Sequence, residues 1–185
     1  MQAPANTRSK NSRSAQRGFS LIELLIVVAI ILIIAAIAIP NLLRSRMSAN
    51  QASAVSNLRT ITTASVSYWV VYANGYPPSL VTLGGSGNTA TCDSANLVDE
   101  TVASAPFQKS GYQFAYTGTQ GPYGPLPPNC SANGFTGYLA TAVPLSTGVT
   151  GNMSYCSSEP GIIHYDVTSA IAASEAACDA LPTLQ

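Results

Sequence analysis

The side chain with the most unusual chemical setting in this sequence is Glu23, a carboxylate inside a long run of apolar residues. The run extends from Phe19 to Ile39, and Glu23 is its only charged residue. A carboxylate at the middle of a lipid bilayer costs roughly 2.5–3.5 kcal/mol, and less near the end of a membrane span. We therefore expect Glu23 to pair with a positive charge from another subunit, such as a newly exposed α-amino group at Phe19. The alternative is a glutamate that reaches the lipid headgroups or becomes protonated.

The apolar run itself predicts a transmembrane helix. As a helix, the segment Phe19–Ile39 would be roughly 32 Å long, enough to cross a bilayer core of about 30 Å. A conventional secretory signal is one rival, because Ala36-Ile37-Ala38 resembles a cleavage box. However, the run is longer than the apolar core of such signals, which is about 7–15 residues. A plain membrane anchor is the other rival, and it leaves Glu23 unexplained.

Charge is distributed unevenly along the chain. Four of the eight basic residues lie before residue 18, with no acidic residue among them, namely Arg8, Lys10, Arg13 and Arg17. A basic start followed by an apolar run keeps the N-terminus on the cytoplasmic side of a membrane. The rest of the chain is mildly acidic, so we expect no nucleic-acid partner.

Four cysteines follow the apolar run: Cys92, Cys130, Cys156 and Cys178. Their spacing is not that of a zinc site, so we expect no metal. An even number on the exported side of a membrane suggests two disulfides, for which three connectivities exist, and buried free thiols are the alternative. The order along the chain favours Cys92–Cys130 with Cys156–Cys178. Loops of such length make each bond worth on the order of 3–4 kcal/mol.

The remaining candidates for catalysis are weak. His164 is the only histidine, and no nucleophile motif accompanies it. Asp99 and Glu100 are adjacent and would point in different directions from a helix, so they form no acid–base pair. Asp93, Asp99 and Glu100 are a possible calcium site, although their spacing is not that of a calcium-binding loop. We therefore expect no cofactor and no enzymatic activity; the chain is better explained as a substrate of enzymes.

The residues around Glu23 form an ordered motif. Arg17-Gly18-Phe19-Ser20-Leu21-Ile22-Glu23, followed by the apolar run and Pro40, closely resembles the type IV pilin and type II secretion pseudopilin superfamily. The resemblance is specific over roughly residues 15–80. It implies that a membrane prepilin peptidase cuts between Gly18 and Phe19, that the new Phe19 amine is N-methylated, and that Glu23 helps dock each subunit against its neighbour. A glycine before the cut also gives a protease close access to the backbone.

One feature departs from this resemblance. Many relatives carry a glycine within the apolar run, and in their filaments the helix opens between that glycine and the following proline. This chain has Leu32, Ile33 and Ile34 in that stretch, and no glycine. Pro40 still removes a helix hydrogen bond and is expected to bend the helix. Whether the helix opens on assembly stays undecided at this point.

Beyond Pro40 the apolar residues keep a helical spacing, so we expect one helix from Phe19 to Ala73, ended by Asn74-Gly75 and two prolines. We divide the chain into a basic leader (1–18), a transmembrane and assembly helix (19–39), an amphipathic helix half (40–73) and a globular head (74–185). The face expected to pack beneath the head comprises Met47, Ala54, Val55, Leu58, Ile61, Thr62, Val66, Tyr68, Trp69 and Tyr72.

The head is expected to hold a short antiparallel sheet laid over this helix, which makes the fold class α+β. A short helix is predicted over Asn96–Ala103, capped by Ser94. A strand is predicted from the alternating pattern of Tyr112–Tyr116. Further strands are predicted at Gly137–Val143, Met153–Cys156 and Ile162–Val167. The last two would form a hairpin through a type II turn at Glu159-Pro160-Gly161.

The resemblance, taken together with these features, implies a structural subunit of a type IV pilus. Its partners would be copies of itself, a prepilin peptidase and the assembly machinery of the inner membrane. The precursor would cross the inner membrane once, and the mature chain would lie in an extracellular filament. A major pseudopilin in a periplasmic filament is the nearest alternative, and a membrane-tethered binding protein that never polymerises is a further one.

Overall fold

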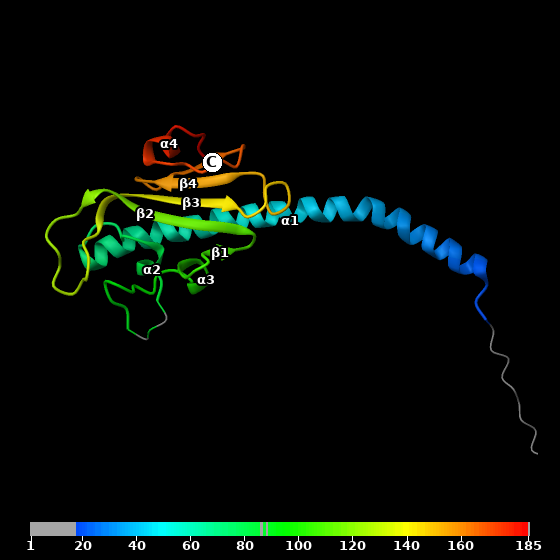
Figure 1. The fold of residues 1–185 in the computed structure, drawn as a ribbon, viewed down its shortest axis with the longest axis horizontal. Helices are drawn as coiled ribbons and strands as arrows, with labels where there is room; N and C mark the ends of the chain where they lie inside the picture. Colours follow the sequence, from blue (N-terminus) through cyan, green and yellow to red (C-terminus); the bar gives the residue numbers. More distant parts are fainter. Residues whose placement is uncertain (1–17, 86, 88, 185) are drawn as a thin grey trace, which may run out of the picture. The chain divides into compact units, whose positions relative to one another are not determined.

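The computed structural model describes residues 18–85, 87 and 89–184. The expected leader, with Arg8, Lys10, Arg13 and Arg17, lies outside the described residues except for Gly18. The chain divides into two compact units, and the boundary between them in the sequence falls between Pro40 and Asn41. A single helix, α1 (Leu21–Tyr72), contributes to both units and contains Pro40 (Figure 1). The long helix was thus predicted to within two residues at its start and one at its end.

In the second unit, α1 buries one face against a sheet. Ala54, Leu58, Ile61, Ser65 and Tyr68 are buried, at spacings of four, three, four and three residues. This spacing keeps the side chains on one side of a helix. The prediction that Val66 belongs to this face is wrong, because its side chain is 46% exposed. The small residues Ala64 and Ser65 are buried instead, which lets the helix backbone approach the sheet closely.

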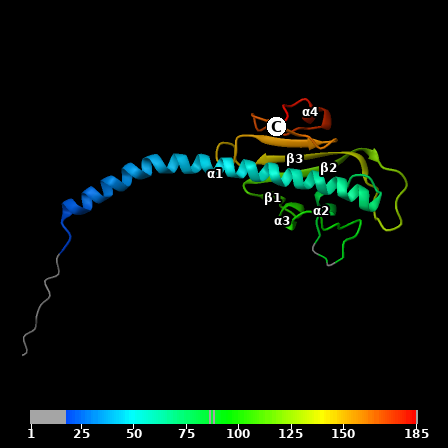
Figure 2. The ribbon, with the colours of Figure 1, turned by 180° about the vertical axis from the view of Figure 1, so that it is seen from behind.

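The sheet is a five-stranded meander in the order β1-β2-β3-β4-β5, and every neighbouring pair is antiparallel. Seen from behind in Figure 2, α1 lies in front of this sheet. The α+β fold class is therefore confirmed. Two expected strands are longer than predicted, because the β2–β3 ladder continues to Pro122 opposite Phe135. The strands are β1 (Gln108–Lys109), β2 (Tyr112–Pro122), β3 (Phe135–Pro144), β4 (Ser154–Ser158) and β5 (Ile163–Asp166).

Aromatic side chains fill the space between helix and sheet. Tyr68 from α1 and Tyr112, Phe114 and Tyr138 from the sheet are among the largest fully buried side chains. The rings of Tyr116 and Tyr138 stack with centroids 5.5 Å apart. Burial raises the pKa of both phenols, which keeps them neutral. Four tyrosines and one phenylalanine thus supply much of the core of a small domain.

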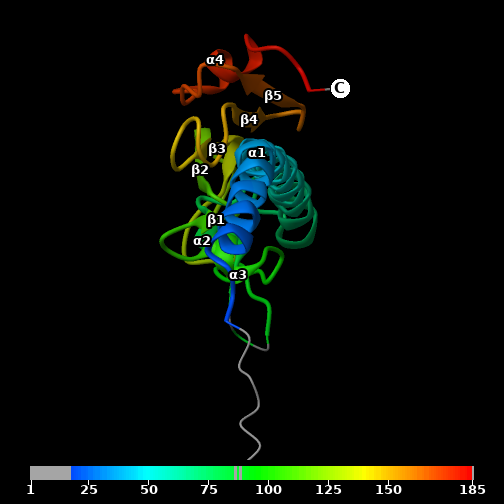
Figure 3. The same ribbon diagram turned by 90° about the vertical axis from the view of Figure 1, so that its right-hand side faces the viewer.

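Three short helices complete the second unit: α2 (Leu80–Leu83), α3 (Glu100–Ala103) and α4 (Glu175–Asp179) (Figure 3). The predicted helix over Asn96–Ala103 is wrong in its first half. Asn96 has a φ of 53°, and the backbone N–H groups of Leu97 and Val98 both donate to the Leu83 carbonyl. A tertiary hydrogen-bond partner therefore replaces the helical one, and α3 begins after Asp99.

The hairpin between β4 and β5 forms where it was predicted, but its turn differs. The peptide bond between Glu159 and Pro160 is cis, and the Gly161 N–H donates to the Ser158 carbonyl at 2.6 Å. A cis proline at the third position of a turn defines type VI, so the expectation of a type II turn is wrong.

Candidate functional site

The first candidate site is the start of α1. Among the described residues, and apart from its own chain neighbours, no atom lies within 4 Å of the position that a Cβ of Gly18 would occupy, and the Phe19 side chain is 85% exposed. Both residues precede the first helical residue, Leu21, so their backbone is not held in a helical ladder. The peptide bond between Gly18 and Phe19 is therefore open to a protease.

Glu23 lies one turn into the helix and folds back on its beginning. The Ser20 N–H donates a hydrogen bond to Oε2 of Glu23 at 2.9 Å, and the Leu24 N–H donates to the Ser20 carbonyl at 3.2 Å. Ser20 thus occupies the N-cap position, and Glu23 supplies the glutamate half of a capping box. The Ser-x-x-Glu spacing was visible in the sequence, but sequence reasoning considered only an intermolecular partner, the lipid headgroups or protonation for Glu23.

The helix beyond Glu23 is apolar on every side, and it has no partner among residues 18–40, the described part of the first unit. The candidate membrane span near the N-terminus of α1 has a mean hydropathy of 3.3, and none of it is buried. Leu24, Ile30, Leu32 and Ile37 are each more than half exposed. Length and composition alone make this segment able to cross a membrane. Water is a poor solvent for such a surface, so it requires lipid or protein neighbours.

Pro40 lies inside α1, where the helix is continuous from Leu21 to Tyr72. The structure therefore holds the unopened form of the helix at this residue. An assembly role for Pro40 stays a prediction.

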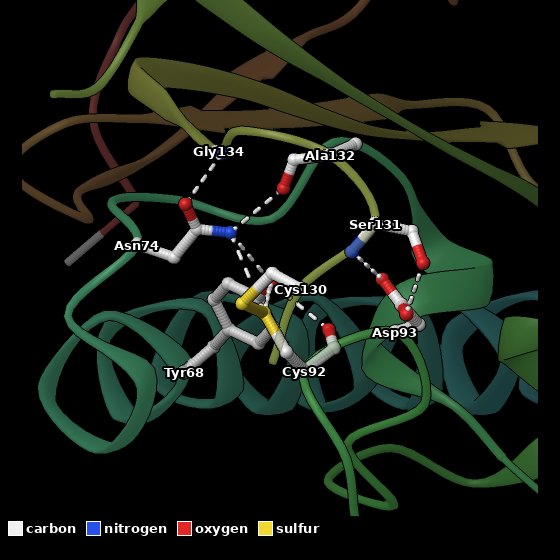
Figure 4. Close-up of a disulfide and its surroundings, with 8 residues drawn as sticks. All are labelled: Tyr68, Asn74, Cys92, Asp93, Cys130, Ser131, Ala132 and Gly134. Atoms are coloured by element: carbon white, nitrogen blue, oxygen red, sulfur yellow. Dashed lines mark hydrogen bonds between the residues drawn. A yellow bond between two sulfur atoms is a disulfide. The ribbon is translucent and has the colours of Figure 1, made fainter. Parts of the chain in front are cut away.

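In the second unit, one disulfide joins Cys92 to Cys130 and holds the connection that follows α1 (Figure 4). Beside it, the Tyr68 hydroxyl donates to the Cys92 carbonyl at 2.9 Å. Burial raises the pKa of Tyr68, so its hydroxyl keeps the proton that it donates. The hydrogen bond from Tyr68 therefore joins a loop of the head directly to the buried face of α1.

Asn74 is the polar centre of this region and is completely buried. Its amide nitrogen donates to the Ala132 carbonyl at 3.0 Å, and its amide oxygen accepts from the Gly134 N–H at 3.1 Å. The amide nitrogen also approaches the Tyr68 hydroxyl and the Cys92 sulfur, each at 3.4 Å. Sequence reasoning treated Asn74 only as a helix stop, because nothing local in the sequence shows that its side chain is buried.

Asp93 closes the same loop beside the disulfide. Its carboxylate accepts from the Ser131 N–H at 3.0 Å and from the Ser131 hydroxyl at 2.7 Å (Figure 4). These hydrogen bonds stabilise the charged form and lower the pKa of Asp93. Asp93 is therefore occupied in closing the Cys92–Cys130 loop.

The second disulfide joins Cys156 on β4 to Cys178 on α4, so both bonds have the pairing that the order along the chain favoured. It anchors a C-terminal segment that runs along β5. The Tyr165 N–H donates to the Pro182 carbonyl at 3.0 Å, and the Leu184 N–H donates to the Ile163 carbonyl at 2.8 Å. This segment therefore covers the edge of the sheet, which protects it from pairing with other chains.

The titratable residues do not converge on a catalytic site. His164 is buried, and its Nδ1 donates to the Leu181 carbonyl at 2.7 Å, which is a structural role. Asp99 is bound to Lys109 at 3.1 Å. Within residues 18–85, 87 and 89–184, no three His, Cys, Asp or Glu side chains are placed to hold a metal ion. Nothing in the described part of the chain shows catalytic activity.

Comparison with known proteins supports the N-terminal motif. Residues 13–39 match the family described as the prokaryotic N-terminal methylation motif. The chain is also 53% identical, over 53 residues, to the type IV major pilin protein PilA of Myxococcus xanthus (strain DK1622). That match covers 29% of this chain and 24% of the length of the relative. No solved structure matches the chain significantly.

The motif followed by an apolar helix fits an inner-membrane precursor and a mature pilus. The chain carries the prokaryotic N-terminal methylation motif, and over 53 residues it is similar to a type IV major pilin.

Proposed function

We propose that this chain is the structural subunit of a type IV pilus. It is inserted in the inner membrane as a prepilin, cleaved after Gly18, N-methylated at Phe19 and polymerised through α1. The observation that carries this proposal is the exposed apolar segment of α1, which begins with a methylation motif and contains the lone carboxylate of Glu23. The similarity to a major pilin supports a pilus subunit over the related pseudopilins.

The physical basis of assembly is an exchange of neighbours. In the membrane, lipid covers the apolar segment of α1; in a filament, copies of the same segment cover one another. Lipid tails are as apolar as these side chains, so close packing between helices and polar contacts, rather than removal from water, drive this exchange. Contacts between unlike faces of identical subunits do not close on themselves and so produce an open helical filament. Glu23 docks each subunit by pairing with a positive charge of its neighbour, which is strong where water is excluded.

Each part of the chain takes one task in this proposal. The leader (1–18) is removed, the apolar segment (19–39) serves first as anchor and then as filament core, and residues 40–73 carry the head. The head (74–185) forms the outer surface, where its two disulfides protect it. Pro40 marks the change from the lipid-facing to the head-bearing half of α1.

Mass spectrometry of the mature N-terminus, combined with electron microscopy of cells, tests this proposal. We expect a chain that starts at a methylated Phe19, and a surface filament that is lost when the gene is removed. A mature chain that starts at Ile39 would instead identify a conventional secretory signal. A methylated Phe19 with a loss of protein secretion, and no loss of a surface filament, would identify a pseudopilin. A correctly trimmed chain that stays monomeric would identify a membrane-tethered protein.

A further inference from the structure

We propose that Asn133 is a site of spontaneous modification, at which its side-chain amide closes onto the backbone nitrogen of Gly134, and that Asn74 holds this reaction back in the intact head. Asparagine followed by glycine favours such a closure, because glycine has no Cβ to shield the nitrogen or to restrict the backbone. The sequence contains two such pairs, Asn74-Gly75 and Asn133-Gly134. The inference concerns the head alone and does not depend on the proposed function.

The two pairs lie against each other in the fold. They belong to similar segments, Ala73-Asn74-Gly75-Tyr76 and Ala132-Asn133-Gly134-Phe135, and an antiparallel bridge joins Tyr76 to Phe135. Each of these two aromatic residues donates its N–H to the carbonyl of the other at 2.8 Å. A Cβ on Gly134 would collide with the backbone carbonyl of Asn74, so the two segments approach as closely as their backbones allow. Each pair therefore restrains the other.

In the first pair, the side chain of Asn74 is held away from its own glycine. Asn74 is fully buried, its Nδ2 donates to the Ala132 carbonyl at 3.0 Å, and its Oδ1 accepts from the Gly134 N–H at 3.1 Å (Figure 4). Both amide atoms are thus bonded to the opposite segment. Rotation of the amide toward the Gly75 nitrogen would break both hydrogen bonds inside the head, which is costly.

In the second pair, the side chain of Asn133 is held much less firmly. It is only partly buried, and its Nδ2 donates one hydrogen bond, to the Gly124 carbonyl at 3.3 Å. Its Oδ1 has no hydrogen-bond partner within the described part of the chain. The restraint on closure lies instead on the Gly134 nitrogen, because this nitrogen must turn out of its hydrogen bond to Asn74 before it can reach Cγ of Asn133.

The reaction needs no reagent other than water. The Gly134 nitrogen forms a bond to Cγ of Asn133 and gives up its proton; the Cγ–Nδ2 bond breaks, and the amide nitrogen leaves with that proton as ammonia. Water then opens the succinimide ring at either carbonyl, which leaves an aspartyl or an isoaspartyl residue at position 133. Either product carries a carboxylate, which is charged at neutral pH. An isoaspartyl residue also lengthens the main chain just before the bridge to Tyr76. Closure at Asn133 thus turns a transient opening of the bridge into a permanent change.

Peptide mapping of the full chain in detergent tests the inference. The chain is incubated at mildly alkaline pH, sampled over time and digested. Mass spectrometry then measures conversion of each asparagine, and enzymatic methylation of isoaspartyl residues identifies the ring-opened product. We expect slow modification at Asn133 and none at Asn74 in the parent chain. Conversion at Asn133 should be about tenfold faster or more after the disulfides are reduced and the chain is unfolded in denaturant, because unfolding removes the restraint on the Gly134 nitrogen.

Two variants separate the role of Asn74 from a general loosening of the head. We expect Asn74→Ala, which removes the acceptor of the Gly134 N–H, to speed modification at Asn133 by about tenfold. Tyr68→Phe is the matched control, because it removes the hydrogen bond to the Cys92 carbonyl but keeps that acceptor, and its rate should stay near that of the parent. Circular dichroism checks that both chains fold.

An equal increase in the two variants, or no increase in a folded Asn74→Ala chain, would overturn the inference. Should Asn74→Ala fail to fold, the parent chain decides by itself. Modification at Asn133 ahead of Asn74 supports the inference, whereas modification at Asn74 first, or an unmodified Asn133 after prolonged incubation, overturns it.

Discussion

The backbone N–H of Ser20 donates a hydrogen bond to the Glu23 carboxylate, with 2.9 Å between Ser20 N and Glu23 Oε2. The same carboxylate that we expect to dock a neighbouring subunit therefore also caps the helix that carries it. Cleavage after Gly18 would place the new amine of Phe19 next to Ser20, within one turn of this carboxylate. The cap holds Glu23 at the very beginning of α1, where an incoming positive charge can reach it.

Variants of Glu23 separate the two roles. We expect Glu23→Gln to keep an acceptor for the Ser20 N–H and so to keep the helix start, but to fail in filament assembly because the charge is gone. Glu23→Ala should lose both the hydrogen bond at the helix start and filament assembly. Cleavage at Gly18 should persist in both variants, as measured by mass spectrometry of the N-terminus. Ser20→Ala is the matched control, because the hydrogen bond comes from the backbone and survives this change. Normal filaments from either Glu23 variant would refute the docking role.

Asn74 should be among the residues most sensitive to substitution in the head. Asn74→Ala leaves the buried Gly134 N–H without the partner that it has at 3.1 Å. The cost of an unpaired buried donor is on the order of 2 kcal/mol in the free energy of unfolding. Thermal unfolding of the full chain in detergent, followed by circular dichroism, measures the change. Asn152→Ala, at an exposed position, is the control and should shift stability by less than about 0.5 kcal/mol. Equal shifts for the two variants would show that the hydrogen bonds of Asn74 contribute little.

The two disulfides should each stabilise the head by about 3–4 kcal/mol, because they close loops whose ends are 38 and 22 residues apart. Loss of the Cys156–Cys178 bond should also free the C-terminal segment. We expect Cys156→Ala/Cys178→Ala to be cut by protease between Ser169 and Leu184 at concentrations that leave the parent chain intact. Cys92→Ala/Cys130→Ala is the comparison, since it should lower stability without selective cutting at the C-terminus. Equal resistance of all three chains would contradict the anchoring role.

Asp99 should make stability depend on pH in the acid range. Hydrogen bonds from the Thr101 hydroxyl and N–H, together with Lys109, lower the pKa of Asp99 to about 2. Because the folded-state pKa lies below that of the unfolded chain, the stabilisation is present above about pH 4 and is lost as the pH falls toward 2. We expect Asp99→Asn to weaken this dependence in acid unfolding. It should not abolish it, because the pKa values of Asp93 and Asp166 are lowered as well. An unchanged acid profile would show that the cap at Thr101 does not persist in solution.

Much of this protein could be predicted because the deciding signals are local. The order Gly18, Phe19 and Glu23 at the start of an apolar run identifies the N-terminal motif. The helical spacing from Met47 to Tyr72 predicts the second half of α1. The alternating pattern of Tyr112–Tyr116 located β2, three further strands lie where they were predicted, and the order of the cysteines favoured the pairing that the structure contains. Each of these features depends on residues close in sequence or on the topology of a simple meander.

Only the tertiary structure decided which residues far apart in the chain form hydrogen bonds and contacts with one another. Leu83 accepts hydrogen bonds from Leu97 and Val98 and so delays the start of α3, and Gly134 and Ala132 bury the side chain of Asn74. Ser65 rather than Val66 is buried, because successive residues of a helix are turned by about 100° and Ser65 lies in line with Ile61 and Tyr68. Sequence patterns specify which residues avoid water. The packing of helix on sheet specifies which residues contact one another when they leave water.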